Sequence, residues 1–117
     1  MSPKIIRWLA WIGILALTVM TIVPADERPT TGLSHDLEHL GAFGFVGLLV
    51  GLSFVIRPPA LYALAFAFSA TLELLQIPLP SRHARLEDLI VDAVGAWIGI
   101  ALGLAIAART TILPRPK

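Results

Sequence analysis

The sequence contains no cysteine and few charged residues, and each shortage excludes a class of protein. Without cysteine there can be no disulfide framework, no thiolate metal site and no cysteine nucleophile. Only 15% of the 117 residues are charged, against about a quarter in an ordinary soluble domain, while 56% are hydrophobic. A soluble domain of this length could not bury so much apolar surface, so part of its solvent must be lipid. The net charge of +1 argues against a nucleic acid partner, which usually requires a strongly basic face.

The apolar residues fall into four segments, each long enough to cross a membrane as a helix. Crossing takes about 20 helical residues, because each residue adds roughly 1.5 Å along the axis. Proline disfavours helix at the preceding residue, and prolines mark the ends of these segments: Pro24, Pro58, Pro59, Pro78, Pro80 and Pro114. The sequence therefore predicts an all-α membrane protein, a four-transmembrane-helix bundle in a single domain, residues 1–117. The expected helices cover about residues 5–23, 37–56, 60–77 and 86–108.

The basic residues are unevenly divided between the two sides of the predicted membrane. One side has Lys4, Arg7, Arg57, Arg109, Arg115 and Lys117, and the other has Arg28, Arg82 and Arg85. Lys and Arg collect on the cytoplasmic side of membrane proteins. We therefore expect both termini in the cytoplasm (N-in/C-in) of a multi-pass protein in the bacterial inner, or cytoplasmic, membrane.

The first apolar segment also allows a different interpretation, a cleaved signal peptide. It has a basic start, an apolar core and a small residue, Ala25, after Pro24. Its apolar run is longer than a usual signal-peptide core, which favours a retained helix. The other three helices keep the same predicted orientation in either case.

All eight acidic residues and all three histidines map to the outer side of the predicted membrane. A charge at membrane depth costs about 2.5–3.5 kcal/mol on insertion scales, so Glu73 and Asp92, which lie inside helices, are unfavourable against lipid. Asp88 and Asp92 share a helix face, as Glu73 and Gln76 nearly do. We expect both faces to point inward, where arginines and histidines can donate hydrogen bonds to them.

Small residues repeat along two of the predicted helices. The stripes are Gly44, Gly47 and Gly51 on the second helix and Gly95, Gly99 and Gly103 on the fourth. In lipid, the close approach of two backbones replaces the hydrophobic drive for helix association, so such stripes are typical of helix contacts. We expect the second and fourth helices to form a tight central pair, with the third helix beside them.

Short motifs within residues 35–103 resemble the VanZ-like domain, a family named for a protein implicated in resistance to teicoplanin. The motifs are Asp36-Leu37-Glu38-His39, Glu73-Leu74-Leu75-Gln76, and Arg82 followed by Asp88, Asp92, Gly95 and Gly99. The sequence departs from the family pattern in two places. The lysine that many relatives carry before the histidine is missing, and Asp92 replaces the usual asparagine. The resemblance implies a membrane protein without a defined reaction, with antibiotic resistance attested for some members.

The outward-facing polar residues form the candidate ligand-binding site, with predicted members Asp36, His39, Glu73, Gln76, Arg82, Asp88 and Asp92. We expect this pocket to bind or shield an envelope lipid headgroup or a lipid-linked cell-wall precursor, rather than to turn over a substrate. An arginine can hold a phosphate through its planar guanidinium. The alternative without a ligand is a structural or assembly role, in which the polar network fixes the register of the helices.

Catalysis is a further alternative for the same region. The spacing of Arg82, Asp88 and Asp92 matches the last motif of type 2 phosphatidic-acid phosphatases, in which a histidine nucleophile stands at the position of Asp88. A lipid-phosphate hydrolase or transferase could use Asp88 as nucleophile together with Glu73. The other phosphatase motifs are missing, which makes this the less favoured hypothesis.

A metal site is conceivable at His35 and His39, because residues four apart on a helix can align two imidazoles. A third ligand from Glu73 or Asp88 would complete such a site. No fuller zinc motif accompanies the two histidines, so we predict neither a metal nor a cofactor. The sequence does not determine an oligomeric state.

Overall fold

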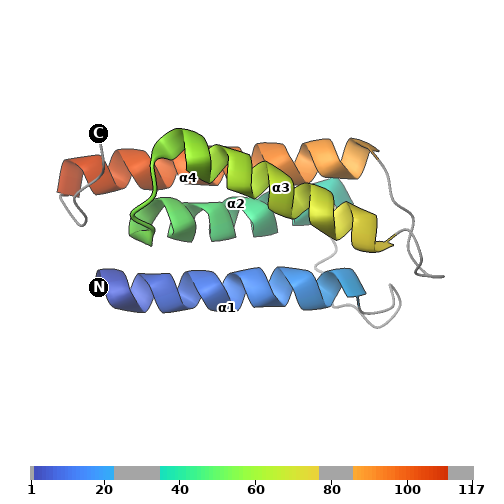
Figure 1. The fold of residues 1–117 in the computed structure, drawn as a ribbon, viewed down its shortest axis with the longest axis horizontal. Helices are drawn as coiled ribbons and strands as arrows, with labels where there is room; N and C mark the ends of the chain where they lie inside the picture. Colours follow the sequence, from blue (N-terminus) through green and yellow to red (C-terminus); the bar gives the residue numbers. More distant parts are fainter. Residues whose placement is uncertain (1, 23–34, 77–85, 111–117) are drawn as a thin grey trace.

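Four long helices account for most of the described part of the chain, residues 2–22, 35–76 and 86–110 of a computed structural model (Figure 1). They are α1 (Pro3–Ile22), α2 (His35–Ser53), α3 (Pro58–Gln76) and α4 (Leu86–Thr110). Each helix is long and apolar enough to cross a membrane, and no strand occurs within these ranges. The prediction of an all-α membrane protein with four transmembrane helices is confirmed.

The charged residues separate to opposite ends of the bundle. The start of α1, the α2–α3 connection and the end of α4 lie together at one end (Figure 1). We call it the basic end, because it has all the described basic residues: Lys4, Arg7, Arg57 and Arg109. The opposite end, where α2 and α4 begin and α3 finishes, is the acidic end. It has all the described acidic residues: Asp36, Glu38, Glu73, Glu87, Asp88 and Asp92.

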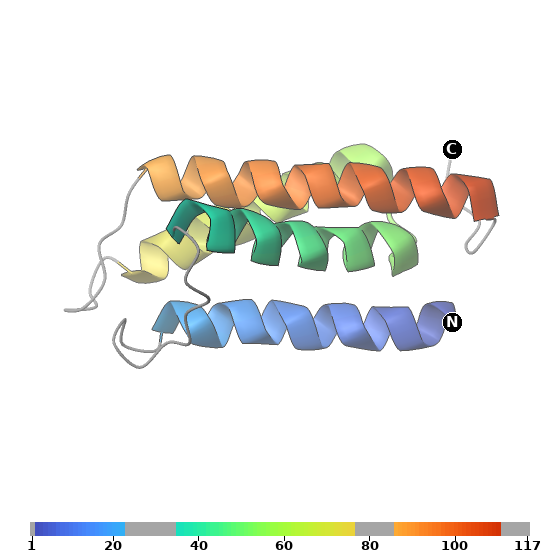
Figure 2. The ribbon, with the colours of Figure 1, turned by 180° about the vertical axis from the view of Figure 1, so that it is seen from behind.

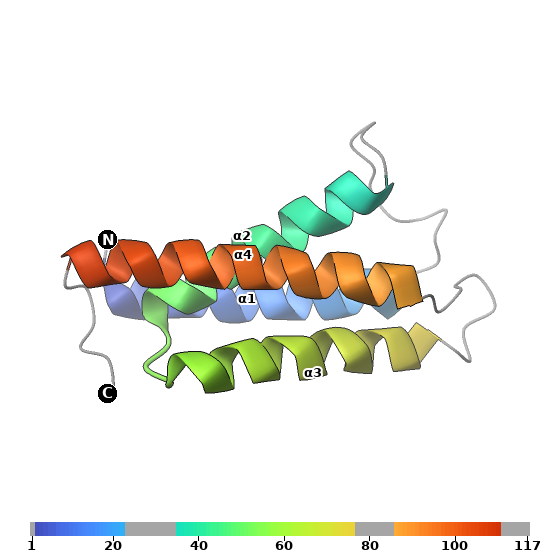
Figure 3. The same ribbon diagram turned by 90° about the horizontal axis from the view of Figure 1, so that it is seen from above.

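The most extensive helix contact joins α2 and α4, which run in the same direction and cross at an angle (Figures 2 and 3). Their backbones touch through glycine. A Cβ atom on Gly51 would lie 2.6 Å from the carbonyl oxygen of Ile100, and one on Gly95 would lie 2.8 Å from the carbonyl oxygen of Leu40. No larger residue fits at such distances, so the glycines determine how closely the two helices approach.

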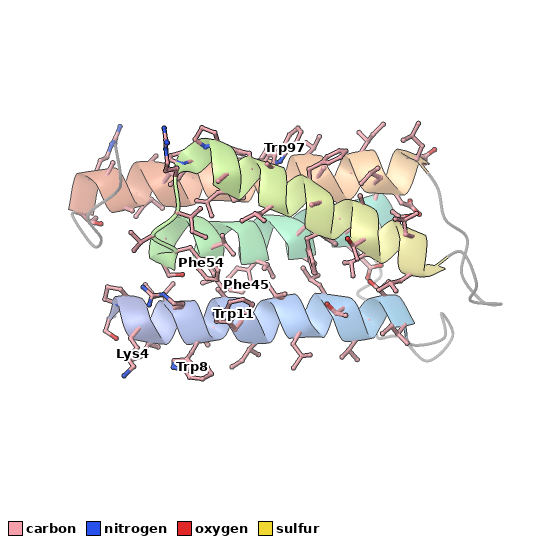
Figure 4. All side chains as sticks on the ribbon, in the orientation of Figure 1. Lys4, Trp8, Trp11, Phe45, Phe54 and Trp97 are labelled. Carbon is pink, nitrogen blue, oxygen red and sulfur yellow. The ribbon has the colours of Figure 1, made fainter. Side chains whose placement is uncertain are left out.

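Helix α1 packs against α2, and hydrogen bonds at the basic end join the two helices. The guanidinium of Arg7 donates hydrogen bonds of 3.3 and 3.1 Å to the backbone carbonyl of Ser53, in the last turn of α2. A terminal carbonyl has no partner within its own helix, so a cation from α1 satisfies it. Next to this contact, the rings of Trp11 and Phe54 lie 5.4 Å apart (Figure 4). Trp8, one turn earlier, points away from the other helices and is exposed (Figure 4).

Helix α2 ends at Ser53, three residues before the predicted end at residue 56, while the other helix ends differ from the prediction by at most two residues. The side-chain hydroxyl of Ser53 donates a hydrogen bond of 2.6 Å to the backbone carbonyl of Leu49, and Arg7 caps the Ser53 carbonyl. The chain cannot continue as helix through Arg57, because Pro58 disfavours helix at the residue before it. Pro58 instead begins α3, where its missing amide hydrogen costs nothing.

The predicted N-in/C-in orientation can be tested on exposed residues at the two ends. Cysteine placed at Glu87, at the acidic end, is expected to react with a membrane-impermeant maleimide in intact cells. Cysteine placed at Pro59, at the basic end, is expected to react only after permeabilisation, because basic residues stay in the cytoplasm. The chain has no cysteine of its own, so the protein without an introduced cysteine should not be labelled and serves as the control. Labelling of the Pro59 position alone in intact cells would reverse the orientation.

Candidate functional site

A histidine and a buried aspartate meet between α2 and α4 near the acidic end. The Nδ1 atom of His39 lies 2.8 Å from Oδ1 of Asp92. The Asp92 side chain is 2% exposed and that of His39 is 19% exposed. With Asp92 ionised, the Nδ1–H of His39 donates to the carboxylate, and a protonated His39 makes the contact a salt bridge. The contact keeps the Asp92 carboxylate away from lipid, where an unpaired charge would be costly.

The glycine contact between α2 and α4 positions this pair. Gly95 lies against the backbone of Leu40, the residue after His39. Asp92 lies on the same face of α4, one turn before Gly95 and Ala96. On the other side, the His39 ring stacks on Phe43, with centroids 6.2 Å apart and planes at 18°. The imidazole is therefore held by a hydrogen bond to α4 and by a ring in the next turn of its own helix.

Two further acidic side chains are buried at the same end, Glu73 in the last turns of α3 and Asp88 in the first turn of α4, each 8% exposed. Leu72, which precedes Glu73, packs in one apolar cluster with Phe43 and Ala96. That cluster lies directly beneath the His39–Asp92 pair. The end of α3 thus reaches the level of the pair, and three buried carboxylates from two helices gather at the acidic end.

The remaining predicted site residues divide between exposed and undescribed positions. Asp36 is exposed at the start of α2. Arg82 and the side chains of Gln76 and His35 lie outside the described residues, so the predicted arginine contact to Asp88 stays a prediction. Within residues 2–22, 35–76 and 86–110, no group of three His, Asp or Glu side chains is arranged to hold a metal ion.

The sequence analysis missed an apolar cavity of about 270 Å³ between the helices. It begins at Phe43, beneath His39, and runs along α2 towards the basic end. Its lining residues are Trp11, Ile14, Leu17, Phe43, Val46, Gly47, Val50, Phe54, Ile56, Leu61, Leu64, Ala65, Phe68, Ala96 and Ile100. No residue pattern marks such a space, because it depends on the separation of α1 and α3 rather than on the face of one helix.

Comparison with protein-family models matches residues 15–107 to a model described as VanZ/LLP1. The match runs from the second half of α1 to near the end of α4. It includes the His39–Asp92 pair, both glycine stripes and all of the cavity lining except Trp11 and Ile14. Neither a curated protein nor a solved structure matches the chain.

Proposed function

Since the chain belongs to the VanZ/LLP1 family, we propose that this membrane protein binds the polar headgroup of an envelope lipid at the acidic end, without turning it over. The observation that carries the proposal is that Glu73, Asp88 and Asp92 are all buried at the end of the bundle where His39 contacts Asp92. Buried charge is costly at membrane depth and marks ligand sites or fixed networks. A glycopeptide-resistance role would follow if the bound lipid were a cell-wall precursor.

The chemistry of the described residues favours a headgroup rich in hydrogen-bond donors. Ionised carboxylates accept hydrogen bonds but cannot donate them, and Nδ1 of His39 is already bonded to Asp92. Sugar hydroxyls and amines match such a set, because each brings the donors that carboxylates lack. Arg82, predicted at the same site, would add a phosphate contact. A lipid-linked glycan precursor and an aminophospholipid both fit this description.

The test is headgroup discrimination by the purified protein. We expect wild-type protein in detergent to bind polyprenyl-pyrophosphate-linked glycopeptide or phosphatidylethanolamine at least about tenfold more tightly than phosphatidylcholine, a difference that Asp88→Asn abolishes. Glu87→Gln is the matched control, because Glu87 is exposed and precedes Asp88 on the same helix. Isothermal titration calorimetry measures the affinities, and circular dichroism checks that each variant keeps its helices.

The other outcomes separate the alternatives. Equal discrimination in wild type and Asp88→Asn would overturn the binding site. Loss of helical structure in Asp88→Asn, rather than loss of ligand, would favour the structural network. Release of inorganic phosphate from a polyprenyl phosphate, abolished by Asp88→Asn, would establish the lipid-phosphate hydrolase instead.

A further inference from the structure

We propose that the apolar cavity is a second lipid site, which holds one acyl chain of an anionic phospholipid whose phosphate lies at the basic end. This site is separate from the headgroup site at the acidic end and does not depend on it. Four observations carry the proposal: the lining of the cavity, its opening, its length, and the charge at its end.

The lining and the opening both indicate a hydrocarbon occupant. The cavity is lined by aliphatic and aromatic residues, and the indole N–H of Trp11 is the one side-chain hydrogen-bond donor among them. Two of them, Trp11 on α1 and Leu64 on α3, are 53% and 55% exposed, so the cavity opens between these helices on the membrane-facing surface. It is therefore continuous with the interface that the four spans make with lipid. An apolar cavity of about 150 Å³ in other proteins takes up benzene, so about 270 Å³ admits a longer apolar group.

The length of the cavity corresponds to one leaflet. Its lining on α2 extends from Phe43, near the middle of the helix, to Phe54, just beyond its end. The eleven steps from Phe43 to Phe54, at about 1.5 Å each, span about 16 Å, which is half of the roughly 30 Å hydrocarbon core. Phe43 and Phe68, with ring centroids 6.3 Å apart, line its inner limit at mid-membrane. A chain that entered from the basic end would stop there, short of His39.

The charge at the basic end fits an anionic headgroup. Ile56 lines the cavity, and the next residue, Arg57, is exposed in the connection between α2 and α3. Lys4 is also exposed at this end, while every described acidic residue lies at the opposite end. Each basic residue near a membrane surface strengthens the attraction to anionic lipid. A phosphate at Arg57 would place the attached chain beside Phe54 and Leu61.

The test compares lipids with identical chains in the purified full-length protein. Native mass spectrometry is used to count lipids during titration with dioleoyl phosphatidylglycerol or dioleoyl phosphatidylcholine. We expect one phosphatidylglycerol to bind each chain tightly. Ala65→Leu, which fills the cavity, is expected to weaken that binding at least about tenfold. Ala67→Leu, on an exposed face of α3 outside the cavity lining, should leave it unchanged.

Two further variants keep the outcome clear. Leu64→Trp, which narrows the mouth of the cavity, should weaken binding in the same direction if Ala65→Leu does not fold. Arg57→Gln should reduce the preference for phosphatidylglycerol over phosphatidylcholine about fivefold, without abolishing binding of the chain. Wild-type affinity in both Ala65→Leu and Leu64→Trp would overturn the proposal, as would a second copy of the protein that covers the cavity in place of lipid. Asp88→Asn should leave this binding intact, so failure here is distinct from failure at the acidic end.

Discussion

Replacing Gly99 with alanine is expected to lower the stability of the detergent-solubilised protein by about 2 kcal/mol or more. A Cβ atom at this position would collide with the carbonyl oxygen of Gly44 and lie 2.7 Å from the backbone nitrogen of Leu48. Both are backbone atoms of α2, so no side-chain rotation relieves the collision and α4 must move away. Unfolding by a rising fraction of sodium dodecyl sulfate, followed by circular dichroism, measures the loss.

Gly41→Ala is the matched control for this substitution. Gly41 also lies on α2, but nothing lies within 4 Å of a Cβ atom built on it. Alanine is a better helix former than glycine by about 1 kcal/mol in water, so the control should leave stability unchanged or raise it. Equal losses from Gly99→Ala and Gly41→Ala would show that the glycine contact does not hold α2 and α4 together.

Replacing Asp92 with alanine is expected to cost about 3 kcal/mol, because it removes the partner of His39 and leaves a hole among buried side chains. Asp92→Asn should cost less than about 1 kcal/mol, since an amide oxygen in the same place still accepts from the Nδ1–H. The same detergent unfolding experiment gives both values.

A double-mutant cycle isolates the pair. His39→Ala and Asp92→Ala are expected to be non-additive by at least about 1 kcal/mol, because each single change already removes the shared hydrogen bond. His39→Ala combined with Glu87→Gln serves as the control cycle, as Glu87 is exposed and should add independently. Additive losses from His39→Ala and Asp92→Ala would mean that the 2.8 Å contact contributes nothing to stability.

The helices were predictable from the sequence because their causes are local. Four apolar runs of spanning length, ended by prolines, determine the number of helices, and α3 begins at one of these prolines, Pro58. The end of α2 was less predictable, because it depends on Arg7 from a different helix. A residue pattern predicts the length of a helix better than it predicts a contact with a residue distant in the chain.

The burial of three acidic side chains was predictable from the sequence, but their contacts were not. Burial of acids in lipid is unfavourable whatever the fold, so Glu73, Asp88 and Asp92 could be chosen from their position alone. The bond from His39 to Asp92 depends on how α2 is rotated and shifted against α4. Glycine spacing indicates which faces of two helices touch, but not how far one helix is shifted along the other. The cavity could not be predicted from the sequence for a related reason, because it depends on the separation of α1 and α3.

The depth of Asp92 determines how a charged ligand bound there would respond to the membrane potential. Asp92 lies six residues after Leu86 in a helix of 25 residues, which is about 9 Å along a helix of about 37 Å. A unit charge that reaches it from the acidic end crosses about a quarter of the membrane. Full crossing is worth about 2.3 kcal/mol per 100 mV, so this passage is worth about 0.6 kcal/mol. The affinity for a charged ligand at Asp92 would therefore change only about threefold between a membrane at 100 mV and one without a potential.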